Sequence, residues 1–142
     1  MTPILLIHYM TCSMMFGLIL IVQLVHYPTF RFIEEKSFAE FEKFHCRKIR
    51  LIVLPVMSLE LLTCIYLAGH NQSPILISNL FLLVATWILT LSVQGKIHQK
   101  LLKKYSTDLI ESLICSNWTR TLLWGIRVGL LTYYVNDVLP SS

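Results

Sequence analysis

Three histidines stand close to the ends of long apolar stretches, where imidazoles could bind a metal or move protons. His26 follows the first apolar stretch, His45 precedes the second, and His98 follows the third. Imidazole suits Zn, Cu, Fe and Ni ions, it ligates haem, and it serves as an acid or base near neutral pH. The sequence predicts that at least two of these histidines hold a transition metal (Fe, Cu or Zn) or haem. Alternatively, they hydrogen-bond a quinone or phenolic substrate, or are only polar tips in water.

Two charged residues lie inside apolar stretches, and each raises the question of how its charge is compensated. Glu60 interrupts the second stretch and Arg127 the fourth. A charge at the centre of a bilayer costs about 2.5–3.5 kcal/mol on insertion scales. We therefore expect Glu60 and Arg127 to form an ion pair that faces the protein interior. Such a pair either only fixes the register of the helices or also contacts a ligand.

The elements that position these residues are predicted to be membrane-spanning helices. Of the 142 residues, 55% are apolar and 14% are charged, whereas soluble domains carry roughly 25% charge. Apolar runs occupy about 4–25, 51–68, 74–93 and 122–139, each near the roughly 20 residues that a spanning helix needs. The first run lacks the basic start and the cleavage site of a signal peptide. We predict a single all-α transmembrane domain over 1–142, folded as an up-down four-helix bundle.

The basic residues predict the orientation of this bundle. All 12 lysines and arginines lie between the first and second runs, between the third and fourth, or within the fourth. By the positive-inside rule, both longer connections are cytoplasmic and both termini lie outside, in a bacterial inner membrane. Nucleic-acid binding is a poor interpretation because these charges border apolar runs. The four cysteines form no CxxC pair, so no disulfide framework is expected.

The connecting segments carry their own helix signals. Ser37 and Glu40 have the spacing of a capping box, and Phe38, Phe41 and Phe44 give the following segment an aromatic face. This segment either lies at the membrane interface or runs straight into the second span. Ser106 or Thr107 is expected to cap the second connecting segment. Pro28 is expected to end the first span just after His26.

Helical spacing gathers further polar residues at the cytoplasmic end. At about 100° per residue, Asn117, Arg120, Trp124 and Arg127 share one face, and Glu60 shares another with Met57 and Cys64. Asn117, Arg120 and Arg127 would bind an anionic or carbonyl oxygen of a substrate, and Glu60 would orient Arg127 or act as a buried acid. Trp118 and Trp124 would supply a flat apolar wall. The predicted substrate-binding residues are Glu60, Asn117, Trp118, Arg120, Trp124 and Arg127.

Other candidate site residues have weaker support from the sequence. His8, Cys12 and Met15 share a helical face that would suit Cu(I), but such residues are also ordinary packing residues. His70 is expected to be solvated in the outer turn. Each half of the chain reads as span, basic segment, span, without a repeat at the level of residues.

Several segments resemble a known family. VHYPTF, FHCRKIRLIVLPVMSLEL, QGKIHQKLL and SNWTRTLLWGIRVGLL together are similar to small bacterial four-span inner-membrane proteins, which are distantly related to a domain-of-unknown-function group containing fungal anthrone oxygenases. The resemblance implies oxidation of a phenolic, polycyclic substrate with help from a metal. One departure is the missing proline two residues before His98. A weaker likeness is to four-span haem-binding protoporphyrinogen oxidases. The positions that match the family pattern are His26, Tyr27, Pro28, His45, Arg50, Pro55, Glu60, His98, Asn117, Trp118, Arg120, Trp124 and Arg127.

Two classes of function remain open from the sequence. In the first, the protein is a metal- or haem-assisted oxidoreductase or oxygenase that acts on a lipophilic or phenolic substrate. In the second, it is a non-catalytic membrane subunit, or it binds lipid or a small molecule, and the phenylalanine face packs against a partner. A homo-oligomer fits either class, whereas four spans are few for a transporter.

Overall fold

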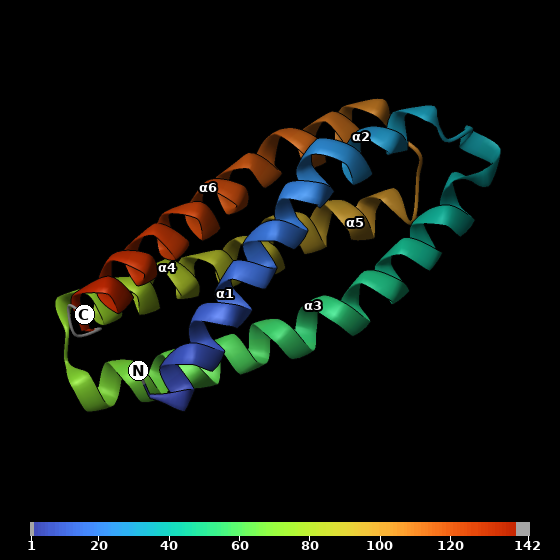
Figure 1. The fold of residues 1–142 in the computed structure, drawn as a ribbon. Helices are drawn as coiled ribbons and strands as arrows, with labels where there is room; N and C mark the ends of the chain where they lie inside the picture. The colour runs from blue at the N-terminus through green and yellow to red at the C-terminus, as the bar shows by residue number, and fades with distance from the viewer. Residues whose placement is uncertain (1, 139–142) are drawn as a thin grey trace.

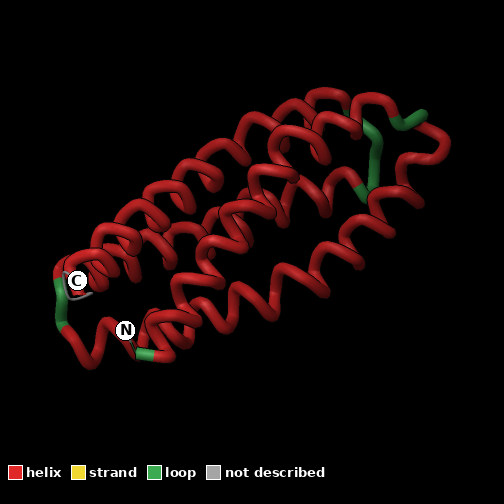
Figure 2. Tube along the Cα trace, viewed as in Figure 1, coloured by secondary structure: helices red, strands yellow, loops and turns green. Residues whose placement is uncertain are grey.

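The computed structural model describes residues 2–138, which form four helical rods and no strand within that range (Figures 1 and 2). The predicted all-α fold is therefore confirmed. The first and third rods each contain a π-helical stretch, and the second and fourth are single long helices. In chain order the elements are α1 (Pro3–Ile21), η1 (Val22–His26), α2 (Tyr27–Thr29), η2 (Phe30–Phe32), α3 (Glu35–Asn71), α4 (Pro74–Leu89), η3 (Thr90–Gln94), α5 (Gly95–Leu101) and α6 (Thr107–Val138).

The first rod continues past Pro28, where the sequence predicted an end. Proline has no N–H, and its ring clashes with the carbonyl four residues back in a regular α-helix. The chain widens into the π-helical stretch η1 just before this proline, and the Tyr27 N–H bonds to the carbonyl of Val22. The rod then continues to Phe32. The prediction that Pro28 ends the helix is wrong because the π-helical turn absorbs the misfit.

The second and fourth rods each join a connecting segment to a span. α3 is 37 residues long and contains Pro55, so the first connecting segment runs straight into the second span. α6 does the same over 32 residues, and residue 139, the predicted end of the fourth span, lies outside the described range. Gln72 adopts a left-handed conformation (φ 43°) after α3, which turns the chain so that α4 begins at Pro74.

The two predicted helix caps have different outcomes. α3 begins at Glu35, two residues before Ser37, whose N–H already bonds within the first turn. The capping box of Ser37 and Glu40 is therefore wrong. The prediction for the second segment is confirmed, because the Ser106 Oγ accepts a hydrogen bond from the Leu109 N–H at 3.3 Å.

The four rods pack so that each contacts two neighbours. α1 contacts α3 and α6, and α4 contacts the same two helices, so α1 and α4 lie on opposite sides of the bundle (Figure 1). The connections 33–34 and 102–106 lie at one end (Figure 2), which we call the basic end because most lysines and arginines flank these connections. The turn at 72–73 lies at the opposite end. At the basic end, Arg31 donates two hydrogen bonds of 2.6 Å to Glu111. These bonds lower the pKa of the Glu111 carboxyl.

Most of the phenylalanine face is covered within the chain. Phe38 is 1% exposed, with its ring 6.0 Å from that of Phe30 and 5.1 Å from that of Tyr105. Phe41 packs edge-on against Phe30 at 5.1 Å. Only Phe44 is largely exposed, at 53%. A partner could therefore contact little of this face.

The distribution of side chains is inverted relative to a soluble bundle. Three rods, Pro3–Phe32, Glu35–Asn71 and Pro74–Leu101, are long and apolar enough to cross a membrane. Away from the basic end, their outer surfaces are apolar, and a soluble protein rarely exposes so many large apolar side chains. These features indicate a membrane protein. Among the fully buried polar residues are His8, Glu42, Glu60, Asn79, Asn117 and Arg127, and among the apolar residues more than half exposed are Met10, Ile21, Leu51, Leu62, Phe81, Ile88, Leu91 and Leu122.

The two halves of the chain share a few features without repeating residue by residue. The first and third rods both begin with proline and both contain a π-helical stretch. Side chains of these two rods also meet across the bundle: His8 contacts Asn79, and Tyr27 contacts His98. Each half of the chain is therefore a helical hairpin of two rods.

Candidate functional site

The three predicted histidines converge at the basic end, from three different rods. His26 ends η1 and His45 lies on α3, and the Nε2 of His26 is 2.7 Å from the Nδ1 of His45. The ring centroid of His45 is 5.3 Å from that of His98 on α5. The π-helical widening before Pro28 helps to direct His26 toward α3, since it changes the register of the residues that follow it. The predicted convergence of these side chains is confirmed.

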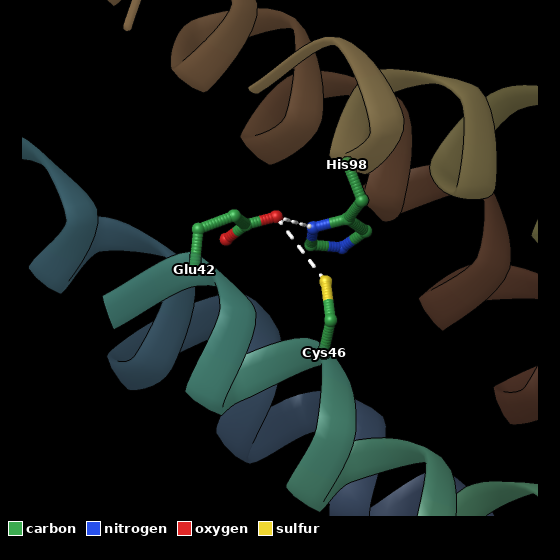
Figure 3. A group of neighbouring side chains, drawn as sticks. All are labelled: Glu42, Cys46 and His98. Atoms are coloured by element: carbon green, nitrogen blue, oxygen red, sulfur yellow. Dashed lines mark hydrogen bonds and ion pairs between the residues drawn. The ribbon is translucent and has the colours of Figure 1, made fainter. Parts of the chain in front are cut away.

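His98 is the centre of a hydrogen-bonded chain that the sequence did not predict. Its Nε2 is 3.1 Å from the Tyr27 hydroxyl, and its Nδ1 is 2.5 Å from the Oε1 of Glu42. The Cys46 thiol donates to the same Glu42 oxygen at 3.4 Å. Figure 3 shows Glu42 and Cys46, one turn apart on α3, directed toward His98 on the facing helix. Glu42 is fully buried, and a buried carboxylate held against an imidazole can orient it and stabilise its protonated form.

The arrangement of possible metal ligands differs from the predicted set of three histidines. Among the described residues, the donor atoms of Glu42, Cys46 and His98 lie within 4.8 Å of one another, and no other such group is present. His26 and His45 form a separate pair. At 2.7 Å their nitrogens are also too close to be the two axial ligands of a haem iron, which would lie about 4 Å apart with iron–nitrogen bonds near the roughly 2.0–2.1 Å typical of imidazole. The pair does not fit haem in that arrangement.

Arg120 is a buried cation without an acidic partner in the described part of the chain. It is 5% exposed, and its Nη1 donates to Asn117 Oδ1 at 3.0 Å. Its guanidinium lies 5.4 Å from the ring centroid of Trp124. The Nε has no hydrogen-bond partner. Because a buried charge is costly unless it is paired, this side chain is suited to an anion or a carbonyl oxygen supplied by a ligand.

A cavity opens beside Arg120 between α3 and the third rod. It has a volume of about 340 Å³, and Tyr27, His98, Gln94 and Arg120 contribute to its lining. Gln94 also has an unpartnered oxygen, Oε1. This volume lies at the lower end of the range for small-molecule sites. We call this cavity the lateral pocket; its apolar walls are Ile49, Val53, Leu54, Leu91 and Leu102.

A second cavity lies between α1 and α3, on the other side of the histidine pair. It has a volume of about 290 Å³ and is almost entirely apolar apart from His26, His45 and Lys48. The Nε2 of His45 is buried and has no hydrogen-bond partner. The two cavities therefore flank the polar groups of the basic end.

The predicted ion pair is present and lies deeper in the bundle. Arg127 Nη1 is 2.8 Å from Glu60 Oε1, with both side chains fully buried. Arg127 also donates to Asn79, and Trp124 donates to Glu60 at 3.4 Å. Glu60 is about four helical turns from His45, so this pair forms its own layer. Trp124 connects it with Arg120.

Of the six predicted substrate-binding residues, only Arg120 lines the lateral pocket. Trp118 is 44% exposed and does not line the lateral pocket, because one residue of helix rotates it about 100° from the buried Asn117. His8 is buried and contacts Thr63 and Asn79, so it belongs to the layer of the ion pair. His70 is exposed, as predicted.

Three residues of the site were missed as functional candidates: Tyr27, Glu42 and Cys46. Glu42 and Cys46 are four residues apart and therefore share a helix face, which was a readable signal. The Glu42 carboxylate was not recognised because the surrounding segment contains many charged residues, and an acidic side chain in such a segment is usually solvated. Tyr27 appeared only as part of the family pattern.

Comparisons with known proteins add no assignment. No protein-family model matches the chain, and no curated protein and no solved structure shows significant similarity to it.

Proposed function

We propose that this is a four-span inner-membrane protein that binds a lipophilic phenol in the lateral pocket and takes up its hydroxyl proton, as an oxidoreductase of phenolic substrates would require. The single observation that carries the proposal is Arg120. This buried guanidinium has no acidic partner among the described residues, and it lines a pocket with apolar walls. A phenolate is apolar except for one anionic oxygen, so it complements both features.

The positions of the basic residues and the apolar outer faces of the helices support the placement in a membrane. α6 carries Arg120 and Arg127, but both face the interior, and its outer face presents Leu122 and Ile126. With this helix, all four rods have an apolar exterior away from the basic end. The basic end would face the cytoplasm, with both termini outside, because lysines and arginines are retained on that side. The lateral pocket would then lie near the cytoplasmic interface, where an amphiphilic molecule can enter from the lipid.

The hydrogen-bonded chain supplies an acceptor for the proton. We assign His98 as the neutral tautomer with its proton on Nδ1, directed to Glu42, so that Nε2 accepts the Tyr27 hydroxyl proton. When a phenol donates its proton to the Tyr27 oxygen, the Tyr27 proton moves to His98. The products are a phenolate beside Arg120 and an imidazolium paired with Glu42. Oxidation would then start from the bound phenolate, with dioxygen as the electron acceptor. For a substrate that is an aromatic diol, the diol loses two electrons and two protons, and dioxygen takes up both to become hydrogen peroxide.

Binding of a polycyclic phenol such as 2-naphthol, measured by fluorescence titration in nanodiscs of neutral lipid, tests this proposal. Val53→Trp fills the lateral pocket and should weaken binding at least tenfold. Ile88→Trp adds the same side chain to the third rod at an exposed position outside the pocket and should leave binding unchanged. Equal affinity in both variants would overturn the proposed site.

A second candidate is the binding of an anionic lipid headgroup. It is favoured by Arg50, which lines the same pocket as Arg120. Adding anionic lipid to the nanodiscs should displace the phenol if this candidate is correct. Lipid that binds with an affinity independent of Val53→Trp would exclude it.

A further inference from the structure

We propose that Glu42, Cys46 and His98 form a binding site for a divalent transition metal of the zinc class. The donor atoms are one carboxylate oxygen, one thiol sulfur and one imidazole nitrogen, all within 4.8 Å of one another. This mixture of ligands is typical of Zn²⁺, and Co²⁺ substitutes for it in a similar geometry. The site shares His98 with the proposed phenol chemistry. An occupied metal site would prevent proton uptake from a phenol, because the His98 Nε2 would already carry a proton.

The ligands come from elements that already hold them together. Glu42 and Cys46 lie one turn apart on the same face of α3, and His98 projects from α5 toward both of them (Figure 3). The existing separations are 2.5 Å between His98 Nδ1 and Glu42 Oε1, and 3.4 Å between Cys46 Sγ and the same oxygen. Tetrahedral zinc ligands lie roughly 3.3–3.6 Å apart, given bonds of about 2.0–2.3 Å. A small outward rotation of the His98 side chain therefore makes room for the ion.

A buried, unpartnered oxygen supplies an independent indication of a ligand. Glu42 is fully buried, and its Oε2 has no hydrogen-bond partner. Leaving such a group unsatisfied is costly, and a cation held by both oxygens of the carboxylate would satisfy it. Cys46 and His98 also line the lateral pocket. A fourth coordination position would face that pocket and stay open to water, which is the arrangement of zinc sites with three protein ligands.

Charge balance favours a divalent ion. The Cys46 thiol must lose its proton to bind the metal. The Glu42 carboxylate and the Cys46 thiolate together neutralise two positive charges, and His98 stays neutral. The occupied site then carries no net charge, which lowers the cost of burial.

Tyr27 would act as the outer partner of the metal-bound histidine. Metal ligation at Nδ1 requires the His98 proton to move to Nε2, which lies 3.1 Å from the Tyr27 hydroxyl. The hydroxyl then accepts this hydrogen bond instead of donating it. Removing such an outer partner costs about 10–100-fold in metal affinity. Tyr27 is therefore a positioning residue for the metal site.

The test is a titration of the purified, metal-free protein with Co²⁺, without phenol, followed by absorption spectroscopy. We expect one equivalent of Co²⁺ to give a thiolate-to-cobalt charge-transfer band, which Zn²⁺ then removes by displacement. Cys46→Ser should abolish the band, whereas Cys115→Ser changes an exposed thiol and should leave it intact. Tyr27→Phe should weaken Co²⁺ binding about 10–100-fold and preserve the band.

Glu42→Gln provides a second test if Cys46→Ser disturbs folding, as judged by the helical circular dichroism signal. It should weaken Co²⁺ binding strongly while keeping a thiolate band at high Co²⁺. The absence of a charge-transfer band in the wild type, or a band that survives Cys46→Ser, would overturn the metal site. Neither result would affect phenol binding by the metal-free protein, so the two proposals fail separately.

Discussion

Among single residues, the two buried arginines differ in whether an acidic side chain pairs with them. Arg127 has a carboxylate partner in Glu60 at 2.8 Å, whereas the neighbours of Arg120 are an amide, an aromatic ring and the Tyr27 hydroxyl, none of them acidic at neutral pH. A paired charge can serve structure alone, and breaking such a pair is strongly destabilising because one charge is left uncompensated. An unpaired charge needs another explanation, and the adjacent lateral pocket provides one. We therefore assign a structural role to Arg127 and a binding role to Arg120.

The structural role predicts non-additive effects on stability. Arg127→Met should lower the free energy of unfolding by about 3–5 kcal/mol, since Glu60 is left buried without a partner. Glu60→Met should have a similar cost. The double variant should be more stable than either single variant, because no uncompensated charge remains. Thermal unfolding in detergent, followed by circular dichroism, measures all three; single variants that unfold like the wild type would contradict the assignment.

The binding role predicts a different result for Arg120. Arg120→Gln should weaken phenol binding by about tenfold to 150-fold, since a hydrogen bond to a charged group is worth about 1.5–3 kcal/mol. Its effect on stability should be small or favourable, because an unpaired buried charge is removed. Isothermal or fluorescence titration beside thermal unfolding separates the two effects. A large loss of stability with unchanged affinity would show that Arg120 is structural.

Among the elements, α1 and α6 approach each other closely at one small residue, Gly125. A Cβ added at Gly125 would lie 3.2 Å from the Phe16 ring on α1, whereas a Cβ at Gly129 would meet nothing within 4 Å. Both glycines belong to the same helix, one turn apart. They therefore form a matched pair for testing this packing.

Gly125→Leu should destabilise the protein by about 1–3 kcal/mol through overpacking. Gly129→Leu should be neutral or slightly stabilising, because it adds a better helix former at an exposed position. Thermal unfolding of the two variants tests the contact between α1 and α6. Equal stability of both variants would mean that these helices do not approach closely at Gly125.

The elements also show what the sequence could and could not predict. The buried face of α6 could be predicted from the sequence. Its residues follow helical spacing, and all of them are buried: Asn117, Arg120, Trp124 and Arg127. The same helical spacing places Trp118 on a different face of α6 from these four residues. The π-helical stretch η1 was not readable, since a proline signal normally ends a helix and only the backbone hydrogen bonds show the alternative. The contact of Tyr27 with His98 depends on two distant helices and has no local signature.

At the scale of the whole molecule, polar groups inside and apolar groups outside define how the bundle sits in its surroundings. Fully buried Glu60, Arg127 and Asn79 contrast with exposed Leu51, Leu62 and Phe81. This arrangement suits lipid, where every polar group must be satisfied internally. The first and third rods contact each other through polar side chains inside the bundle, His8 with Asn79 and Tyr27 with His98.

The proposed orientation predicts a one-sided pattern of cysteine labelling. Cys115 is exposed and Cys46 is partly exposed near the basic end, while Cys12 and Cys64 are buried. In a Cys46→Ser background, a membrane-impermeant maleimide should label Cys115 in inverted vesicles and not in right-side-out vesicles. Asn71→Cys, introduced in the same background together with Cys115→Ser, places the thiol at the opposite end and should give the reverse pattern. Labelling of Cys115 from the outside would invert the proposed topology.

The measurement that tests the central claim most directly is the absorption spectrum of 2-naphthol bound to the metal-free protein at neutral pH. Free 2-naphthol is protonated under these conditions, and its anion absorbs at longer wavelength. We expect the wild-type protein to bind the anion, and we expect Tyr27→Phe still to bind naphthol but to shift the bound form toward the neutral phenol. A bound phenol that stays neutral in the wild type would contradict proton uptake by the chain of Tyr27, His98 and Glu42.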